Sequence, residues 1–172
     1  MLNYSEIMKT LEEQMSFYAA YHQDARNKAT HFVGVPAIVL SLMVPLSWLS
    51  FEGVSAAMAT TAVLLAYYLA LDLWLGLAMC VVMGVLLGAG QSIADQGALA
   101  GWTWFGILFV GGWILQLVGH VFEGRKPALA DNLFQIFVAP IFLAAEVFFA
   151  LGYKPRLHAA MRERALRLRA GV

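Results

Sequence analysis

The stretch LAGWTWFGILFVGGWILQLVG, residues 99–119, contains no charged side chain. An α-helix needs about 20 mostly apolar residues to cross the hydrocarbon core of a bilayer, because it rises only about 1.5 Å per residue. The stretch therefore predicts a membrane-spanning helix. Three further runs of this kind precede it in the chain, at residues 32–50, 54–71 and 73–90.

The composition agrees with a membrane location. Of the 172 residues, 61% are hydrophobic and 13% are charged, whereas about 25% are charged in an ordinary soluble domain. We expect an all-α, polytopic membrane helical bundle in a single membrane domain, 1–172. Its predicted parts are an N-terminal amphipathic helix (1–23), the helical bundle (24–152) and a basic C-terminal tail (153–172). The single cysteine, Cys80, excludes a disulfide framework and a cysteine metal site.

The basic residues predict the orientation. No Lys or Arg occurs between Lys28 and Arg125, although the net charge of the chain is 0. Cytoplasmic loops are enriched in Lys and Arg, so the chain should enter the first span from the cytoplasmic side and return there after four spans. The basic tail, and hence both termini, should also be cytoplasmic. The membrane itself is either a bacterial inner membrane or the endoplasmic reticulum.

A fifth apolar run, residues 133–152, contains Pro140 and Glu146. One full crossing by this run would carry the basic tail to the far side of the membrane. We therefore predict a re-entrant or bent segment that is broken at Pro140 and buried in protein, where irregular backbone is tolerated.

Two amphipathic segments flank the spans. Residues 5–21 carry apolar side chains at helical spacing, namely Ile7, Leu11, Met15 and Tyr18. Residues 157–169 form a basic helical pattern. This pattern is typical both of a helix at the membrane surface and of a solvated charged helix, and the sequence leaves both open.

This predicted topology places three of the four histidines at one membrane face. His22 and His31 precede the first span, and His120 ends the fourth. The simpler interpretation is that each histidine by itself caps a helix or lies at the interface between membrane and water. The alternative is a shared metal site.

Helical geometry restricts the shared site. His22 and His31 are nine residues apart, which on one continuous helix is about 900° and places them on opposite faces. They can share a metal only if the chain breaks between them. Asp24 is a suitable N-cap for a new helix that begins near Ala25. In that helix Asn27 and His31 are i, i+4 neighbours, so Asn27 could orient the imidazole.

The fourth span ends in a polar stripe. At 100° per residue, Trp113, Gln116, His120 and Glu123 fall within an arc of about 80°. Gln116 could therefore support the metal ligands, as Asn27 could. Glu123 could complete a histidine and carboxylate ligand set, which suits non-haem Fe(II) and O2 chemistry and is also compatible with zinc. Alternatively, Glu123 pairs with Arg125 or Lys126.

Other polar residues are weaker candidates. Asp72 and Glu146 lie in or between apolar runs, where ionisable residues are functional candidates, and Glu146 should be near the site. His158 falls in the basic tail and is interpreted as a surface residue. The chain has no Gly-rich phosphate loop, and its basic tail is too small to indicate a nucleic-acid partner.

Three stretches resemble motifs of the yeast-type 2-hydroxy fatty acid dioxygenase family. They are YHQDARNKATHFVGVP at 21–36, WILQLVGHVFEGRKPALADNL at 113–133 and APIFLAAE at 139–146. The resemblance implies a small polytopic membrane protein that uses Fe(II) and O2 to shorten 2-hydroxy fatty acids by one carbon, in α-oxidation. It also implies iron binding by the motif histidines, here His22, His31 and His120. The ligand role of Glu123 is our own inference.

The expected function is thus an Fe(II) site at the cytoplasmic face, with the acyl tail of the substrate in the lipid bilayer. Arg125 or Lys126 could attract the substrate carboxylate, unless the pair serves only as a topological signal. The competing hypotheses are a non-catalytic metal-binding membrane protein and a small transporter. No inverted repeat or ionisable track supports transport. Assembly into a homo-oligomer is left open.

Overall fold

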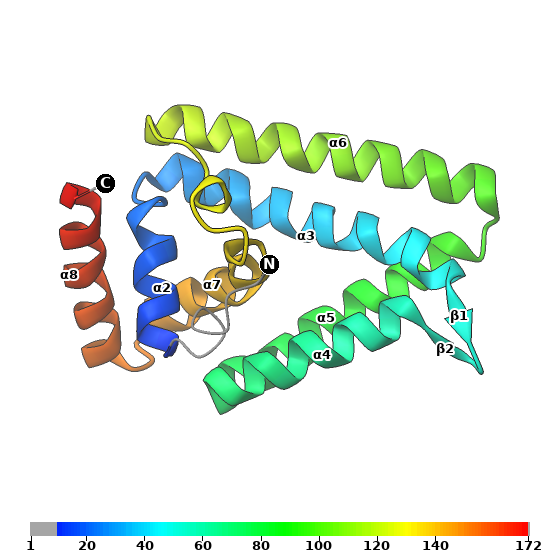
Figure 1. Cartoon of the computed structure of the whole chain (residues 1–172), viewed down its shortest axis with the longest axis horizontal. Coiled ribbons are helices and arrows are strands. Elements are labelled where there is room, and N and C mark those ends of the chain that lie inside the picture. Colours follow the sequence, from blue (N-terminus) through cyan, green and yellow to red (C-terminus); the bar gives the residue numbers. More distant parts are fainter. Residues whose placement is uncertain (1–9, 172) are drawn as a thin grey trace. The chain divides into compact units, whose positions relative to one another are not determined.

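The computed structural model describes residues 10–171 and confirms the all-α fold (Figure 1). Within these residues lie seven α-helices, a short β-hairpin and one 3-10 turn. The helices are α2 (Leu11–Ala20), α3 (Ala25–Trp48), α4 (Ala56–Leu71), α5 (Leu73–Ala94), α6 (Ala98–Glu123), α7 (Gln135–Ala150) and α8 (Pro155–Gly171). Ile7, expected on the first amphipathic helix, lies outside the described residues.

The described chain packs as two compact units. One unit contains the residues up to Ala29 together with those from Leu117 onward, and the other is Thr30–Gln116. Helices α3 and α6 run continuously through both units. The expectation of a single membrane domain stays a prediction.

In the second unit, α4 and α5 form an antiparallel hairpin joined at Asp72 (Figure 1). Asp72 ends α4 and caps α5, because its Oδ1 accepts the backbone N–H groups of Trp74 and Leu75, each at 3.0 Å. A helix N-terminus leaves its first N–H groups without helical partners, and a carboxylate is well suited to accept them. The buried Asp72 therefore has a structural task.

Helices α3 and α6 approach closely at two glycines of the second unit. A Cβ on Gly112 would lie 2.7 Å from Ile38 Cγ1 and 3.0 Å from the backbone oxygen of Gly34. Small residues at such a crossing let helix backbones pack against each other in lipid. The other glycines marked by the same sequence pattern have open space around them: Gly84, Gly88, Gly106 and Gly111.

A β-hairpin precedes α4. Ser50–Phe51 (β1) pairs antiparallel with Val54–Ser55 (β2) around Glu52 and Gly53, which both have positive φ, 49° and 83°. Two consecutive positive φ angles are typical of a type I′ hairpin turn. The expected start of a helix at Val54 is therefore wrong: α4 begins at Ala56, after the Ser55 hydroxyl accepts the Met58 N–H at 3.2 Å.

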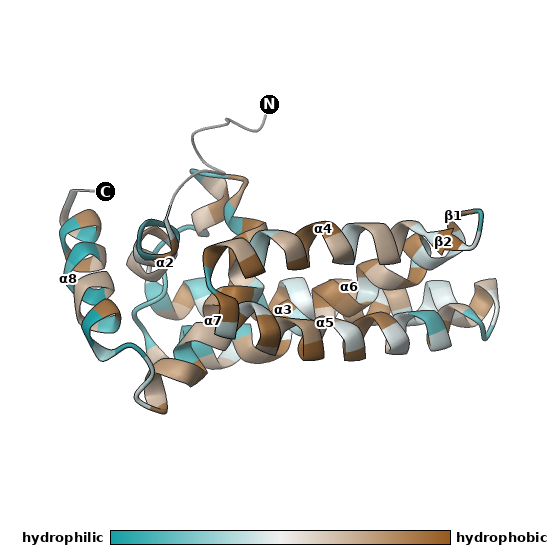
Figure 2. Ribbon diagram, turned by 90° about the horizontal axis from the view of Figure 1, so that it is seen from below, coloured by the Kyte–Doolittle hydropathy of each residue, from teal (hydrophilic) through white to brown (hydrophobic). Residues whose placement is uncertain are grey.

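Among the residues that the structure describes, three helices are long and apolar enough to cross a membrane: α3, α5 and α6. Helices α4 and α7 are apolar but have only 16 residues each, about 24 Å, against a hydrocarbon core of about 30 Å. Side chains such as Val63, Val81 and Val121 are more than two thirds exposed, as a lipid-facing surface requires. Figure 2 shows the contrast between the apolar α4 and α5 and the hydrophilic α8. The chain is thus a membrane helical bundle, with fewer full-length helices than the four expected.

Helix α7 continues through Pro140. The predicted break is not observed, since Pro140 is the sixth residue of the helix and its missing N–H removes only the bond to the carbonyl of Ile136, in the first turn. Whether α7 is re-entrant in the bilayer stays a prediction.

In the first unit, α2 packs against both α7 and α8. Arg164 of α8 forms ion pairs with Glu13 at 3.3 Å and Glu12 at 3.9 Å on α2. Met161 and Ala165 of α8 are buried. The basic tail is thus a helix docked on α2 along one side, and whether its outer face lies at the membrane surface or in solvent stays a prediction.

The close approach of α3 and α6 can be tested by Gly112→Ala. The new methyl group would meet backbone atoms of α3, so the variant should lose about 1–3 kcal/mol of stability through overpacking. Thermal unfolding in detergent micelles measures the change. The matched control is Gly111→Ala, where the space is open and alanine should be neutral or stabilising by up to about 1 kcal/mol. Equal unfolding midpoints for the two variants would contradict the tight crossing.

Candidate metal centre

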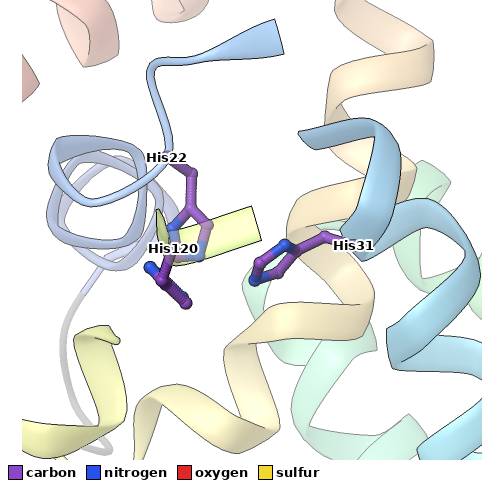
Figure 3. Close-up of side chains that lie close together, drawn as sticks. All are labelled: His22, His31 and His120. Atoms are coloured by element: carbon purple, nitrogen blue, oxygen red, sulfur yellow. The ribbon is translucent and has the colours of Figure 1, made fainter. Parts of the chain in front are cut away.

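The structure brings His22, His31 and His120 together (Figure 3). One ring nitrogen from each lies within 4.8 Å of the others, and all three side chains are buried. His22 follows α2, His31 is in the second turn of α3, and His120 is in the last turn of α6. Histidines that share no helix face in the sequence thus meet because separate helix ends carry them.

His22 is oriented by the last turn of α2. Its Nδ1 donates to the backbone oxygen of Tyr18 at 2.7 Å, and its ring stacks on the Tyr18 ring with centroids 3.9 Å apart. A carbonyl oxygen only accepts, so Nδ1 must carry the proton. The lone pair then resides on Nε2, which is the arrangement typical of a metal-binding histidine.

The predicted chain break separates His22 from His31. Helix α2 ends at Ala20 and α3 begins at Ala25, with Asp24 as its N-cap. Asp24 Oδ1 accepts the Arg26 backbone N–H at 2.8 Å, which confirms the cap. Hydrogen bonds from the side chain and backbone of Arg26 lower the pKa of Asp24 to about 2.

His120 is placed by the way α6 ends. The N–H of Arg125 bonds to the carbonyl of His120 and the N–H of Gly124 to that of Val121, at 3.4 and 3.2 Å. Gly124 has a φ of 67°, so this is a Schellman ending that requires glycine. The His120 ring lies edge-on to that of His22, with centroids 5.0 Å apart.

Glu123 is buried one turn beyond His120, and it forms hydrogen bonds and an ion pair with groups other than the histidines. Its Oε2 accepts the backbone N–H groups of Gln23 at 2.9 Å and Asp24 at 2.7 Å, and its Oε1 pairs with Arg169. The pairing expected with Arg125 or Lys126 is therefore replaced by one with Arg169. The ligand role of Glu123 stays a prediction, which these contacts do not favour.

The three polar residues expected to support the metal ligands have different surroundings. The Nδ2 of Asn27 donates to the Tyr21 carbonyl at 3.3 Å and to Glu123 at 3.2 Å. Gln116 is buried, with its amide nitrogen 2.9 Å from where a Cβ on Gly34 would lie. Glu146 forms a 2.7 Å ion pair with Lys28. The contact predicted between Asn27 and His31 stays a prediction.

The two basic residues after α6 have protein partners. Arg125 donates to the backbone oxygen of Arg169 at 2.8 Å, and Lys126 pairs with Asp131 at 2.5 Å. Asp131 also accepts the Tyr21 hydroxyl at 2.6 Å. Burial and this hydrogen bond raise the pKa of Tyr21 to about 12, so the phenol keeps its proton.

His158 lies apart from the cluster. Its ring stacks on Phe149, with centroids 4.6 Å apart and planes at 7°. Sequence reasoning missed three residues around the site: Tyr18, Lys28 and Arg169. Only Tyr18 had a readable signal, because it precedes His22 by four residues on one helix.

The donor set fits a divalent transition metal. Neutral imidazoles are good ligands for iron and zinc, and three of them leave further coordination positions of such a metal open. Nitrogens bound at about 2.1 Å to one tetrahedral metal lie about 3.4 Å apart, so metal binding would draw the ring nitrogens closer by at most about 1.4 Å from the 4.8 Å limit of the cluster.

The fold and the site together define a polytopic α-helical membrane protein with a buried three-histidine cluster of metal-binding type. A family model described as "2-hydroxy-palmitic acid dioxygenase Mpo1-like" matches residues 8–151, and the chain belongs to this Mpo1-like family. It is 35% identical over 154 residues to the 2-hydroxy-palmitic acid dioxygenase MPO1 of Saccharomyces cerevisiae, covering 88% of this chain and 87% of that protein. No solved structure matches the chain. All three histidines lie inside the matched range, and α8 lies outside it.

Metal analysis of the detergent-purified protein tests the centre. The native protein should carry about one equivalent of a transition metal after anaerobic loading with Fe(II). Each of the variants His22→Ala, His31→Ala and His120→Ala should lose most of it, since two imidazoles bind far more weakly than three. His158→Ala is the matched control and should retain it. Unchanged metal content in all three cluster variants would refute the site.

Proposed function

We propose that this protein is an iron-dependent dioxygenase that converts 2-hydroxy fatty acids to fatty acids one carbon shorter. The observation that carries the proposal is the buried cluster of His22, His31 and His120 in a chain of the Mpo1-like family. The yeast relative is named for a dioxygenase acting on 2-hydroxy-palmitic acid.

The three histidines would hold Fe(II) through one ring nitrogen each. When bound, Fe(II) supplies O2 activation and attracts the carboxylate and hydroxyl oxygens of the substrate. Iron is preferred to zinc for this reaction because zinc has no redox chemistry. The hydrogen bond from His22 to the Tyr18 carbonyl keeps the nitrogen lone pair on the opposite side of that ring.

The proposed reaction balances without an external reductant. A 2-hydroxy acid and one O2 give the shortened acid, CO2 and water. The bond between C1 and C2 breaks, C2 is oxidised from an alcohol to a carboxylic acid, and C1 leaves as CO2. The substrate supplies all four electrons that O2 accepts.

The surroundings of the cluster suit an amphipathic substrate. Tyr18 and Phe142 flank the His22 ring at centroid distances of 3.9 and 6.0 Å and exclude water from it. The apolar helices would leave the acyl tail in the bilayer while the acid group meets the metal. Arg125 and Lys126 remain the proposed cations for the carboxylate, and Lys126 is the more accessible, with 59% of its side chain exposed.

The location proposed for this reaction follows from the Lys and Arg distribution. The cluster and both termini would be on the cytoplasmic side of a bacterial inner membrane or of the endoplasmic reticulum. The basic residues on both sides of the apolar helices support this orientation.

The activity is tested by anaerobic reconstitution with Fe(II), followed by O2 and 2-hydroxypalmitate. O2 consumption, CO2 release and the shortened acid should appear in a ratio of 1:1:1, as the balance requires. His158→Ala should keep the activity, and each cluster variant should lose at least about 100-fold because it loses the metal. Stoichiometric iron binding without substrate consumption would instead identify a non-catalytic metal-binding membrane protein.

A further inference from the structure

We propose that the Glu123–Arg169 pair, in which α8 contributes the arginine, positions His22 for metal binding. The proposal rests on the metal site described above and concerns how that site is held. It makes Glu123 and Arg169 positioning residues. Neither residue was assigned this task by the sequence.

Glu123 contacts the chain break between α2 and α3 directly. The two residues that follow His22 are Gln23 and Asp24, and both donate their backbone N–H groups to Glu123 Oε2, at 2.9 and 2.7 Å. Between two helices these N–H groups have no place in a helical ladder, and buried backbone donors need a partner. A carboxylate is the strongest acceptor that a side chain can offer them. Glu123 therefore sets the path of the backbone immediately after His22.

The same oxygen also contacts the start of α3. Asn27 donates its Nδ2 to Glu123 Oε2 at 3.2 Å and to the Tyr21 carbonyl at 3.3 Å. Tyr21 immediately precedes His22. Asn27 and Glu123 together therefore connect the backbone just before His22 with the backbone just after it. A negative charge at this place is also favoured by the dipole of α3.

The negative charge of Glu123 is neutralised by Arg169. Its side chain is fully enclosed, and a buried carboxylate without a cation is strongly unfavourable. Arg169 supplies that cation to Oε1 and also donates to the carbonyl of Ala20, the last residue of α2, at 3.4 Å. Arg169 thus contacts the chain before the break and the carboxylate that holds the chain after it.

Arg169 is itself held in place by contacts of α8 with the rest of the first unit. Arg125, just beyond the end of α6, donates to the backbone oxygen of Arg169 at 2.8 Å. Helix α8 is further attached to α2 by Arg164 and Glu13. Because α8 lies outside residues 8–151, this support comes from a part of the chain that the family model does not cover. Metal affinity should therefore depend on a docked C-terminal helix.

The experiment uses the full chain purified in detergent. Co(II) binding is titrated by its visible absorption, and amide hydrogen exchange is followed over residues 21–27 without metal. The variants are Arg169→Gln, which removes the charge, and Arg169→Lys, which keeps it. The matched control is Arg167→Gln, which removes an exposed ion pair with Glu163 within α8 and leaves both Glu123 and the contacts of α8 with α2 untouched.

We expect Arg169→Gln to raise the Kd for Co(II) by about 10- to 100-fold, the effect typical of removing a partner behind the metal ligands. Exchange at Gln23 and Asp24 should accelerate in the same variant. Arg169→Lys should restore part of the affinity, and Arg167→Gln should stay within about twofold of the native protein. If Arg169→Gln behaves like Arg167→Gln in both measurements, the inference is wrong while the metal site stands.

Glu123→Gln separates positioning from ligation. If Glu123 only positions His22, the Co(II) absorption bands should keep their energies in Glu123→Gln and Arg169→Gln, and both variants should bind more weakly. Altered bands in Glu123→Gln, with normal affinity in Arg169→Gln, would make Glu123 a ligand and overturn the inference. A native protein that binds no Co(II) would overturn the metal site itself, and the inference with it.

Discussion

The periodicity of the α-helix is the constraint on which the site depends. Two histidines nine residues apart cannot face one metal from one continuous helix, so α2 has to end and α3 has to begin between them. A break exposes backbone donors, and near lipid these donors must find acceptors within the protein. Glu123 accepts two of them, and Asp24 caps the new helix. The same chain break therefore brings the histidines together and requires the acceptors that satisfy its backbone N–H groups.

Much of the site could be predicted from the sequence because its parts obey local rules. The break at Asp24 follows from capping, and the expectation that His22, His31 and His120 meet follows from counting apolar spans. The task of Glu123 could not be found in this way. A carboxylate one turn after a histidine looks the same in the sequence whether it turns toward a metal or toward backbone N–H groups. The role of Arg169 could not be predicted for a related reason. Its partner Glu123 is 46 residues away in the sequence, and no sequence periodicity indicates how α8 packs.

The fold could be predicted from the sequence to a similar extent as the site. Hydropathy locates apolar helices well, because the bilayer requires length and apolar composition and little else. It does not distinguish the β-hairpin at Ser50–Ser55 from the start of α4, since Phe51 and Val54 are apolar in either state. The predicted break at Pro140 was also wrong, because the cost of a proline in a helix depends on which carbonyl loses its donor. Lengths and ends of helices are set by caps and turns, and these are weaker signals than hydropathy.

The docking of α8 also has a consequence for lipid electrostatics. The segment from Lys154 to Arg169 carries six basic residues, but Arg164, Arg167 and Arg169 are already paired with carboxylates of the protein. At most three of the six charges therefore remain to attract anionic headgroups. At about 1 kcal/mol for each basic residue near an anionic surface, the attraction is at most about 3 kcal/mol, half of what the sequence suggests. If α8 faces an anionic membrane, the charge of that membrane therefore contributes less to holding the helix than its six basic residues suggest.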